Sequence, residues 1–404
     1  MADQYDPQSD SSIRIKAIYI HPVKSCGPIE LDRALLTKAG FMYDRCFAIA
    51  TESARVDAGL EWRFISQRTK PQMSQIKTEL WLPKKDSNPH DPLVQAGGCL
   101  VLTFPDPEPP TWINRLDALL HTWTPSTQPQ VSFTVPLQPT PTQLHAFNIH
   151  QKAFAIHSRT AHGLDLSPIP SVAAALPQLK QFLGLPQRQP LTLLRCTPAT
   201  LVRTKTDLAP LAHIGSPSLH GYTDQQPLNI NSLSSVHAVS ALLPPENRPL
   251  NALRFRANVW IAGAPAYDEE TWKRFRVRPR RSSGGGVEEQ QQRVAATICV
   301  VCRTSRCTMP NVDPERGTFD ADAPLPGRKR GRPQPSATLV EYRMVETGNG
   351  AALGFLGMHC VPEDRSLEEA GEERGGGGLW VAVGDEVEVL ERGVHLTGST
   401  ANEY

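Results

Sequence analysis

The chain has 404 residues, of which 39% are hydrophobic, and 42 Lys and Arg balance 41 Asp and Glu to a formal net charge of +1. This hydrophobic content can form a core, which excludes a wholly disordered chain. The balanced charge argues against a protein built on phosphate contacts. At roughly 150 residues per domain the length predicts two or three domains, and 37 Pro residues argue against a fold of long helices.

The sequence shows no targeting or membrane signal. No run approaches the ~18 apolar residues that span a bilayer. The first twelve residues carry Asp3, Asp6 and Asp10 and no Arg, which fits neither a signal peptide nor a transit peptide. Eight Cys are too few for a disulfide scaffold. We therefore expect an intracellular, cytoplasmic protein whose cysteines are thiols.

Short apolar runs, bounded by Pro, Gly, Asp or Ser, recur through the first half. They predict an antiparallel barrel or sandwich rather than repeated strand–helix–strand units. A helix is expected over 171–185 with Ser171 as its N-cap, and Pro177 is expected to interrupt it or to begin a second helix. Strands are expected at 13–20, 46–51, 100–104, 131–135 and 152–157.

A second strand-rich block follows. One short helix is expected over 234–243, and a turn is expected at 383–386 between the last two strands. Low-complexity segments at about 280–293, 324–336 and 362–378 are interpreted as solvated insertions, because their composition cannot offset the entropy of ordering. Strands are expected at 191–196, 227–231, 258–263, 293–302 and 379–390.

These elements predict a mainly β fold with a few helices, of the α+β class. We expect a disordered tail over 1–11 and two β-barrel-type domains, over 12–187 and 188–394. The insertions fall in the second domain.

Three cysteines, Cys299, Cys302 and Cys307, lie within nine residues. A zinc site or an iron–sulfur cluster is weakly indicated, because both normally take four ligands and no fourth Cys is close. Cys299 and Cys302 lie in an apolar run, where Cys is commonly a small buried hydrophobe. Cys307 follows Arg306, and a guanidinium beside a thiol favours the thiolate, the form that binds metal or attacks.

Cationic and hydroxyl side chains recur at strand ends. Lys24-Ser25 precedes Cys26-Gly27, Asp44-Arg45 precedes a strand, and 254–258 (RFRAN) opens another. A Lys charge, a hydroxyl and a flexible backbone suit an anion. The spacing is not that of a nucleotide-binding phosphate loop. Each segment alone is also typical of a solvated strand end.

In their order and spacing, these segments resemble the MOSC superfamily, in which an N-terminal MOSC β-barrel domain precedes a MOSC domain. The chain is similar to the mitochondrial amidoxime reducing component and to the C-terminal part of molybdenum cofactor sulfurases. The resemblance spans about 12–392 apart from the insertions. It is carried by 21–26, 44–45, 67–68 with Pro71 and Met73, 254–258, 305–307, 312–317 and 383–385.

The resemblance implies a role for each matching residue. Cys307 matches the catalytic Cys that ligates molybdenum of the pterin cofactor. Three departures bear on the pocket: Thr304 stands where the family often has Cys, Ala257 replaces a usual Pro, and His359 is expected to replace an aromatic neighbour of the pterin. The segment 222–227 aligns ambiguously. The residues that match cofactor-lining positions are Lys24, Ser25, Arg45, Arg256, Asn258, Ser305 and Arg306.

The resemblance further implies a molybdenum-dependent oxidoreductase that reduces N-hydroxylated or N-oxide-type substrates. The sequence shows no second redox centre, so electrons are expected from a separate protein such as a cytochrome b5 and its reductase. The alternative is a non-redox carrier of the molybdenum cofactor or of sulfur. Pyridoxal phosphate binding enters only as a family-level association, because no counterpart of the sulfurases' pyridoxal-phosphate domain is expected here.

The segment 327–333 (GRKRGRP) resembles the core of an AT-hook, whose Arg side chains enter the minor groove of A·T-rich DNA. One hook binds weakly, and the net charge of +1 adds little attraction. A basic loop inserted in the second domain is the favoured interpretation, and nucleic acid is an unlikely partner.

Overall fold

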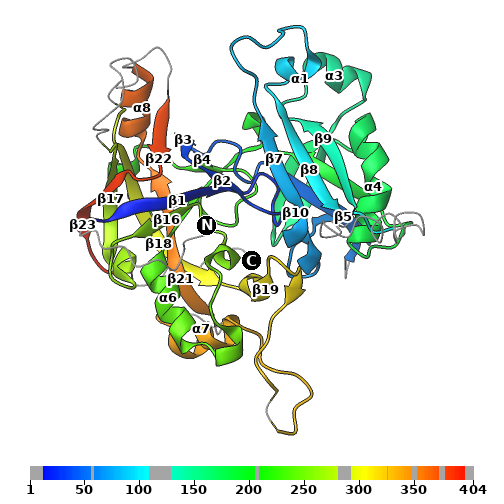
Figure 1. Cartoon of the computed structure of the whole chain (residues 1–404). Helices are drawn as coiled ribbons and strands as arrows, with labels where there is room; N and C mark the ends of the chain where they lie inside the picture. Colours follow the sequence, from blue (N-terminus) through cyan, green and yellow to red (C-terminus); the bar gives the residue numbers. More distant parts are fainter. Residues whose placement is uncertain are drawn as a thin grey trace, which may run out of the picture.

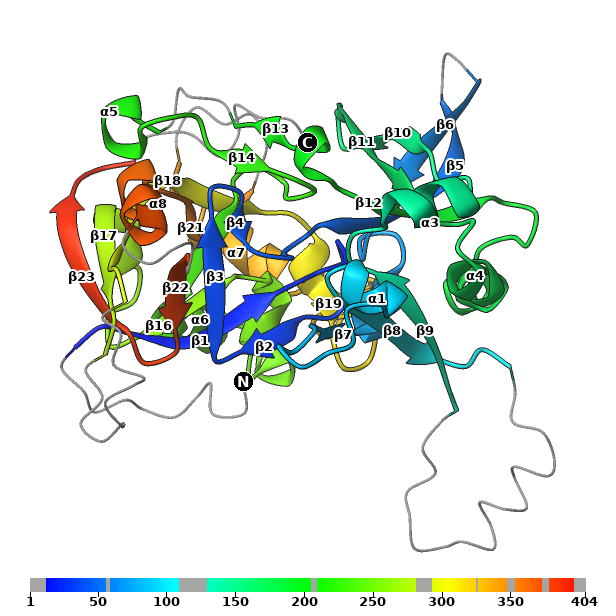
Figure 2. The same ribbon diagram turned by 90° about the horizontal axis from the view of Figure 1, so that it is seen from above.

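The computed structural model describes residues 12–55, 59–108, 129–204, 209–280, 293–324, 326–346, 353–372 and 378–395. The tail predicted over 1–11 and most of the insertion predicted over 280–293 lie outside these residues. The chain folds into two strand-rich bodies that lie side by side (Figures 1 and 2).

The larger body is an eight-stranded sheet in the order β16-β15-β21-β18-β17-β23-β1-β2, in which β1 also pairs with β16. That pairing closes the ring, and β2 lies outside it on β1. The strands are β1 (Arg14–Ile20), β2 (Ile29–Leu31), β15 (Leu228–Ser232), β16 (Val259–Ala262), β17 (Trp272–Arg278), β18 (Ala296–Arg306), β21 (Gly354–Pro362) and β23 (Glu386–Arg392).

The long strand β18 is buried on both faces, which explains its nearly continuous apolar sequence. Ile298 and Val300 point into the main core of this barrel. Cys299 and Val301 pack into a separate apolar cluster on the other face. The alternation follows the two-residue repeat of a strand.

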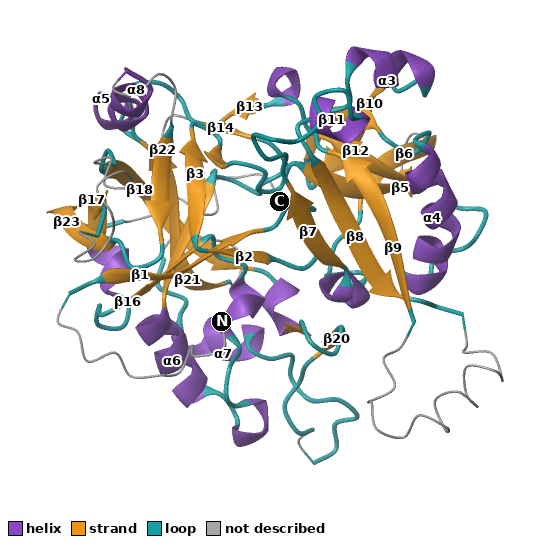
Figure 3. Cartoon of the chain, turned by 45° about the horizontal axis from the view of Figure 1, so that its top comes forward, coloured by secondary structure: helices purple, strands orange, loops and turns teal. Residues whose placement is uncertain are grey.

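The smaller body contains a second closed barrel and a three-stranded sheet covered by helix α4 (Pro170–Phe182) (Figure 3). A parallel contact between β6 and β10 closes the barrel. These closed sheets confirm the mainly β fold with two barrel-type domains. The barrel strands are β5 (Phe47–Arg55), β6 (Gly59–Phe64), β10 (Gln151–Ile156), β11 (Arg159–Asp165) and β12 (Leu191–Arg195), and the sheet strands are β7 (Lys77–Trp81), β8 (Cys99–Pro105) and β9 (Gln130–Pro136).

Strand pairing crosses the boundary predicted at 187/188. The first strand, β1, belongs to the larger barrel, while β12 pairs with β5 in the smaller one. The β3–β4 hairpin (Arg33–Thr37 and Gly40–Phe41) pairs with β22 (Leu379–Ala382) near the other end of the chain. The chain therefore passes from the larger body into the smaller one between β4 and β5.

Several strands, such as β17 and β21, and two helical segments differ from the sequence expectations. Helix α4 runs through Pro177 as one helix and begins at Pro170, one residue before the expected N-cap, Ser171. Proline removes one backbone hydrogen bond, but Val172, Ala175 and Leu179 anchor the helix in the core.

The segment predicted as an insertion over 362–378 contains helix α8 (Asp364–Glu372). The side chain of Ala370 is buried, and Leu367 packs against the core of the larger barrel. The spacing of these two residues puts both on one face of the helix, a signal that the high charge of the segment obscures. Among the described helices, none is long and apolar enough to cross a membrane.

The remaining elements are short, apart from helix α6, which matches the helix predicted over 234–243 to within a residue. They are η1 (Pro71–Gln75), α1 (Pro92–Gln95), α3 (Pro141–Ala146), η2 (Pro198–Thr200), β13 (Val202–Arg203), α5 (Leu211–Ile214), β14 (Leu219–His220), α6 (Leu233–Leu242), η4 (Pro245–Asn247), η5 (Ala252–Phe255), η6 (Asp268–Thr271), η7 (Met309–Asn311), β19 (Val312–Asp313), β20 (Thr318–Phe319) and α7 (Ser336–Tyr342).

Gly40 makes the close contact between the β3–β4 hairpin and the segment that enters β15. Its φ is +90°, and an added Cβ would lie 2.4 Å from the backbone oxygen of Pro227. Gly59 has a similar φ of +86° and open space around it. We predict that Gly59→Ala costs about 1 kcal/mol of stability, for the left-handed backbone alone, and that Gly40→Ala costs about 1–3 kcal/mol more because of the clash. Urea unfolding of both variants measures the difference, and equal losses would contradict the contact.

Candidate functional site

One cleft gathers every residue that the sequence analysis assigned to a site. Its walls come from the loop after β1, the start of β5, the segments 223–229 and 254–258, the end of β18, and β21. These segments are distant in sequence and come together because β1 belongs to the larger barrel. The predicted residues that line the cleft are Lys24, Ser25, Arg45, Arg256, Asn258, Ser305, Arg306 and Cys307.

Cys307 directly follows β18 and is partly exposed. Its Sγ accepts a hydrogen bond from the backbone N–H of Met309 at 3.5 Å. Cys299 and Cys302 are instead 2% and 1% exposed, and burial raises their pKa values to about 11 and about 12. These two are therefore packing residues in their thiol form, and Cys307 is the cysteine that faces the cleft.

Lys24 is a buried cation at one end of the cleft. Its Nζ donates to the backbone oxygen of Tyr222 at 2.9 Å, pairs with Asp224, and lies 5.2 Å from the ring centre of Phe64. Burial lowers its pKa, and the Asp224 carboxylate opposes that effect. The neighbouring Ser25 is 2% exposed, and its Oγ has no hydrogen-bond partner among the described residues.

Arg45 and Arg256 lie against each other. Nη2 of Arg45 donates to the backbone oxygen of Arg256 at 2.7 Å, and Nη1 of Arg256 donates to that of Cys26 at 2.8 Å. Nη2 of Arg256 is buried and has no hydrogen-bond partner in the part of the chain that the structure describes. Burial and the nearby Arg45 lower the pKa of Arg256 to about 10.

Three cleft residues that are not glycine adopt left-handed backbone. Ser25, Arg45 and Arg256 have φ values of 70°, 45° and 54°. Such conformations cost of order 1 kcal/mol or more each and cluster at functional sites. The backbone is therefore held in a strained arrangement around the cleft.

The buried carboxylate of Asp44 compensates the positive charge of Arg45 from the interior of the protein. Its side chain is 1% exposed, pairs with Arg45, and accepts a 2.7 Å hydrogen bond from the backbone N–H of His21. Burial would raise its pKa, but Arg45 and His21 outweigh burial and lower it to about 2. Asp44 thus remains a carboxylate at neutral pH.

Arg306 and Asn258 brace the cleft wall. The guanidinium of Arg306 donates to the backbone oxygens of Leu356 at 2.7 Å and Phe255 at 2.9 Å. The side-chain oxygen of Asn258 accepts from the backbone N–H of Asn229 at 3.1 Å. These contacts make Arg306 a support for strand β21 and for η5, whereas its place in the sequence suggested a guanidinium beside the thiol. Successive side chains of a strand point to opposite sides, which explains the difference.

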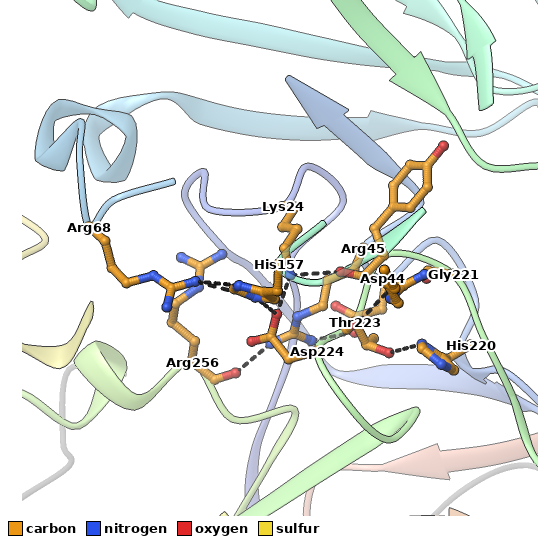
Figure 4. Close-up of polar contacts among 12 residues, drawn as sticks. Lys24, Asp44, Arg45, Arg68, His157, His220, Gly221, Thr223, Asp224 and Arg256 are labelled. Atoms are coloured by element: carbon orange, nitrogen blue, oxygen red, sulfur yellow. Dashed lines mark hydrogen bonds and ion pairs between the residues drawn. The ribbon is translucent and has the colours of Figure 1, made fainter. Parts of the chain in front are cut away.

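Asp224, His157 and Arg68 join the site from outside the predicted set (Figure 4). His157 lies between β10 and β11, and its Nε2 is 3.1 Å from Oδ1 of Asp224, while its Nδ1 is 2.9 Å from a guanidinium nitrogen of Arg68. Burial would raise the pKa of Asp224, but Lys24 and His157 hold it well below its usual range. Asp224 falls in the ambiguous segment 222–227, and no pattern marks His157.

The cleft is therefore mainly cationic. Asp224 is the one acidic residue among its described lining, and His359, also on the wall, has its pKa lowered to about 3 by burial and by Arg306. A partly exposed thiol lies at the same cleft. Such a donor set suits an anionic ligand that also carries a soft metal. The cations of the lining are Lys24, Arg45, Arg254, Arg256 and Arg306.

The buried histidines make the fold sensitive to acid. Burial lowers the pKa values of His21, His220 and His359 to about 3 each. In the unfolded chain each of these histidines takes up a proton near pH 6.5, whereas in the folded chain it does so only near pH 3. Stability is therefore full above pH 6.5 and falls as the pH is lowered through this window, by about 1.4 kcal/mol per pH unit for each histidine.

We predict that His220→Gln makes the loss of stability between pH 6 and pH 4 shallower, by about one proton's slope. The exposed His90→Gln is the control and should leave the slope unchanged. Urea unfolding at a series of pH values gives both slopes. Identical slopes in wild type and His220→Gln would contradict the assignment.

Two family models match the chain. The MOSC N-terminal beta barrel domain matches residues 12–106, and the MOSC domain matches residues 217–388. No curated protein matches it. The finer similarity to amidoxime reducing components and sulfurases stays a prediction. Both family matches agree with the two barrels and with the order of the cleft segments. Together they cover about two thirds of the sequence. The chain therefore belongs to the MOSC superfamily.

Proposed function

We propose that the protein binds the molybdenum cofactor in this cleft and uses it to reduce N-hydroxylated or N-oxide-type compounds with electrons from a separate protein. MOSC domains are associated with molybdenum cofactor binding. The observation that carries the proposal is the meeting of Cys307 with unpartnered polar atoms of Ser25 and Arg256 at one cleft.

The residues present fit the cofactor. A buried polar group without a partner costs about 1–3 kcal/mol, and five side-chain atoms of the described lining are in this position, two of them being Oε1 of Gln226 and Nδ1 of His359. The other three are Oγ of Ser25, Nη2 of Arg256 and Nε of Arg254. Each can donate a hydrogen bond, and phosphate oxygens accept them. The pterin phosphate and dithiolene are negatively charged, which matches the cationic lining.

Cys307 would ligate molybdenum, because this metal favours a soft thiolate. Lys24, Ser25, Arg45, Arg256, Asn258, Ser305 and Arg306 would hold the pterin and its phosphate, directly or by shaping the wall. When bound, the cofactor supplies a redox-active metal that takes up oxygen from N-oxygenated compounds. Reduction of an N–OH group to N–H consumes two electrons and two protons and releases one water.

The chain's own residues prepare the site electrostatically. Asp224 stays ionised and supports the charged form of the buried Lys24, so that a cation is available to an anionic ligand. Both protein donors to Asp224, from Lys24 and from His157, contact its Oδ1. Asp44, which is buried, likewise provides the counter-charge for Arg45. The two carboxylates allow a cationic cleft to exist without ligand.

We predict that protein loaded with the molybdenum cofactor reduces benzamidoxime when dithionite-reduced methyl viologen supplies electrons. Cys307→Ser should fall to the background rate, because the metal loses its thiolate ligand. Cys46→Ser is the matched control, since Cys46 is the other partly exposed cysteine, and it should keep its activity. Full activity in Cys307→Ser would contradict the proposal, and a loaded wild type without turnover would favour a carrier of the cofactor instead.

We further predict that Arg256→Ala retains the pterin about 10- to 150-fold less well, the equivalent of one lost charge-assisted contact of ~1.5–3 kcal/mol. Lys24→Ala should behave similarly. The control is Arg316→Ala, whose side chain is 64% exposed and outside the cleft lining. Pterin fluorescence after gel filtration measures retention. Equal retention in Arg256→Ala and Arg316→Ala would argue against an anion site here.

A further inference from the structure

A basic loop follows the β19–β20 hairpin. The described residues 320–324 and 326–334, here called the basic loop, run from β20 to α7, and Figure 1 shows them as the long yellow-orange loop below the body. The tip carries Arg328, Lys329 and Arg330, all exposed. Within the described part of the chain, none of the three forms an ion pair, whereas Arg332 pairs with Asp322 and Glu341.

The two ends of the basic loop, here called its stem, are hydrogen-bonded to each other. The backbone N–H of Asp322 donates to the oxygen of Arg332 at 2.9 Å, and Nε of Arg332 returns a 3.0 Å bond to Oδ2 of Asp322. A Cβ on Gly331 would lie 1.6 Å from the backbone oxygen of Asp322, so this packing requires glycine. Gln334 is 1% exposed at the base. The three cationic side chains therefore extend from a loop whose ends are fixed by hydrogen bonds and close packing.

The base of the loop touches the wall of the cleft. Arg254 lines the cleft, and its Nη2 lies 3.0 Å from Oδ2 of Asp320. Asn247 donates to Oδ1 of Asp320 at 3.2 Å and to the backbone oxygen of Ala321 at 3.1 Å. The eight steps along the chain from Asp320 to Arg328 span at most ~29 Å. A standard interface of about 800 Å² per partner is some 30 Å across, so one partner can contact the tip and cover the cleft.

Exposed apolar side chains precede and follow the basic loop in the sequence. Phe319, which directly precedes it, is 50% exposed. Tyr342 is 51% exposed and follows Glu341, whose carboxylate contacts Arg332. Met344 is 57% exposed. Arg, Tyr, Phe and Met are the residue types enriched at protein–protein interfaces.

The same contacts disfavour DNA as the partner. An AT-hook places its Arg-Gly-Arg core in the minor groove, but here Arg332 is bound to Asp322 and Gly331 is packed against the stem. Only three free cations remain at the tip, and the whole chain has a net charge of +1. Affinity for a polyphosphate would be weak, because it grows with the number of phosphates neutralised.

We propose that the basic loop, with Phe319, Tyr342 and Met344 at its base, docks an acidic redox protein that delivers electrons to the cleft. The redox part of this inference rests on the proposed function. Carboxylates on the partner would pair with Arg328, Lys329 and Arg330, and the apolar side chains would form the centre of the interface. Because the charges lie at the tip, they would mainly accelerate and orient the encounter.

The test compares wild type with Arg328→Gln/Lys329→Gln/Arg330→Gln. A matched variant, Lys84→Gln/Lys85→Gln/Arg188→Gln, removes the same charge from exposed positions on the smaller body. Each protein is titrated by calorimetry with a soluble cytochrome b5 and, separately, with an A·T-rich DNA duplex. Benzamidoxime reduction is then measured with cytochrome b5 and its reductase, and with reduced methyl viologen, which needs no docking.

The loop variant should bind cytochrome b5 at least tenfold more weakly at low salt and show a correspondingly higher KM for it. Its viologen-driven rate should be unchanged, and the matched variant should behave as wild type. Unchanged binding of cytochrome b5 by the loop variant would overturn the proposal. It would also be overturned if wild type bound the duplex more tightly than cytochrome b5 and the loop variant lost that DNA binding. A wild type inactive with viologen would instead contradict the proposed function, and the calorimetric titration would still decide the docking surface.

Discussion

Positive charge gathered around one cleft is the constraint on which the rest of the structure depends. Removing an ion from water costs several kcal/mol unless a partner compensates it. Asp44 compensates Arg45 from the interior, and Asp224 compensates Lys24 at the more exposed side. Two of the lining donors that lack a partner among the described residues, on Ser25 and Arg256, belong to residues with left-handed backbone. Backbone strain, burial and donors without a partner thus coincide at this cleft. An anionic ligand would accept hydrogen bonds from those donors.

The exchange of strands between the two barrels makes this gathering possible. Because β1 pairs with β16, the loop that follows β1 lies beside the segment that precedes β16. Lys24 and Ser25 therefore meet Arg256 and Asn258, although more than two hundred residues separate them. Gly40 permits the close approach of the next hairpin to Pro227. The smaller body contributes His157 and Phe64 to the surroundings of Lys24.

Local sequence patterns predicted much of this molecule. Short apolar runs located about half of the described strands but missed long ones such as β17 and β21, and the order of the motifs predicted eight of the residues that line the cleft. Pairing across the chain was not predictable, because β1 carries no local sign of which barrel it joins. Asp224 and His157 were missed for a related reason: their contact links two bodies, and nothing in either segment indicates the partner. Helix α8 was missed because its charge obscured one short apolar face.

The metal and pterin content of protein purified from a cofactor-competent host tests the central claim most directly, with Cys307→Ser measured alongside. We expect near-stoichiometric molybdenum and pterin in wild type. In the variant we expect pterin with little molybdenum, because the residues that would hold the phosphate are intact while the thiolate is gone. Molybdenum retained in full by Cys307→Ser, or wild type that carries zinc alone, would contradict the account.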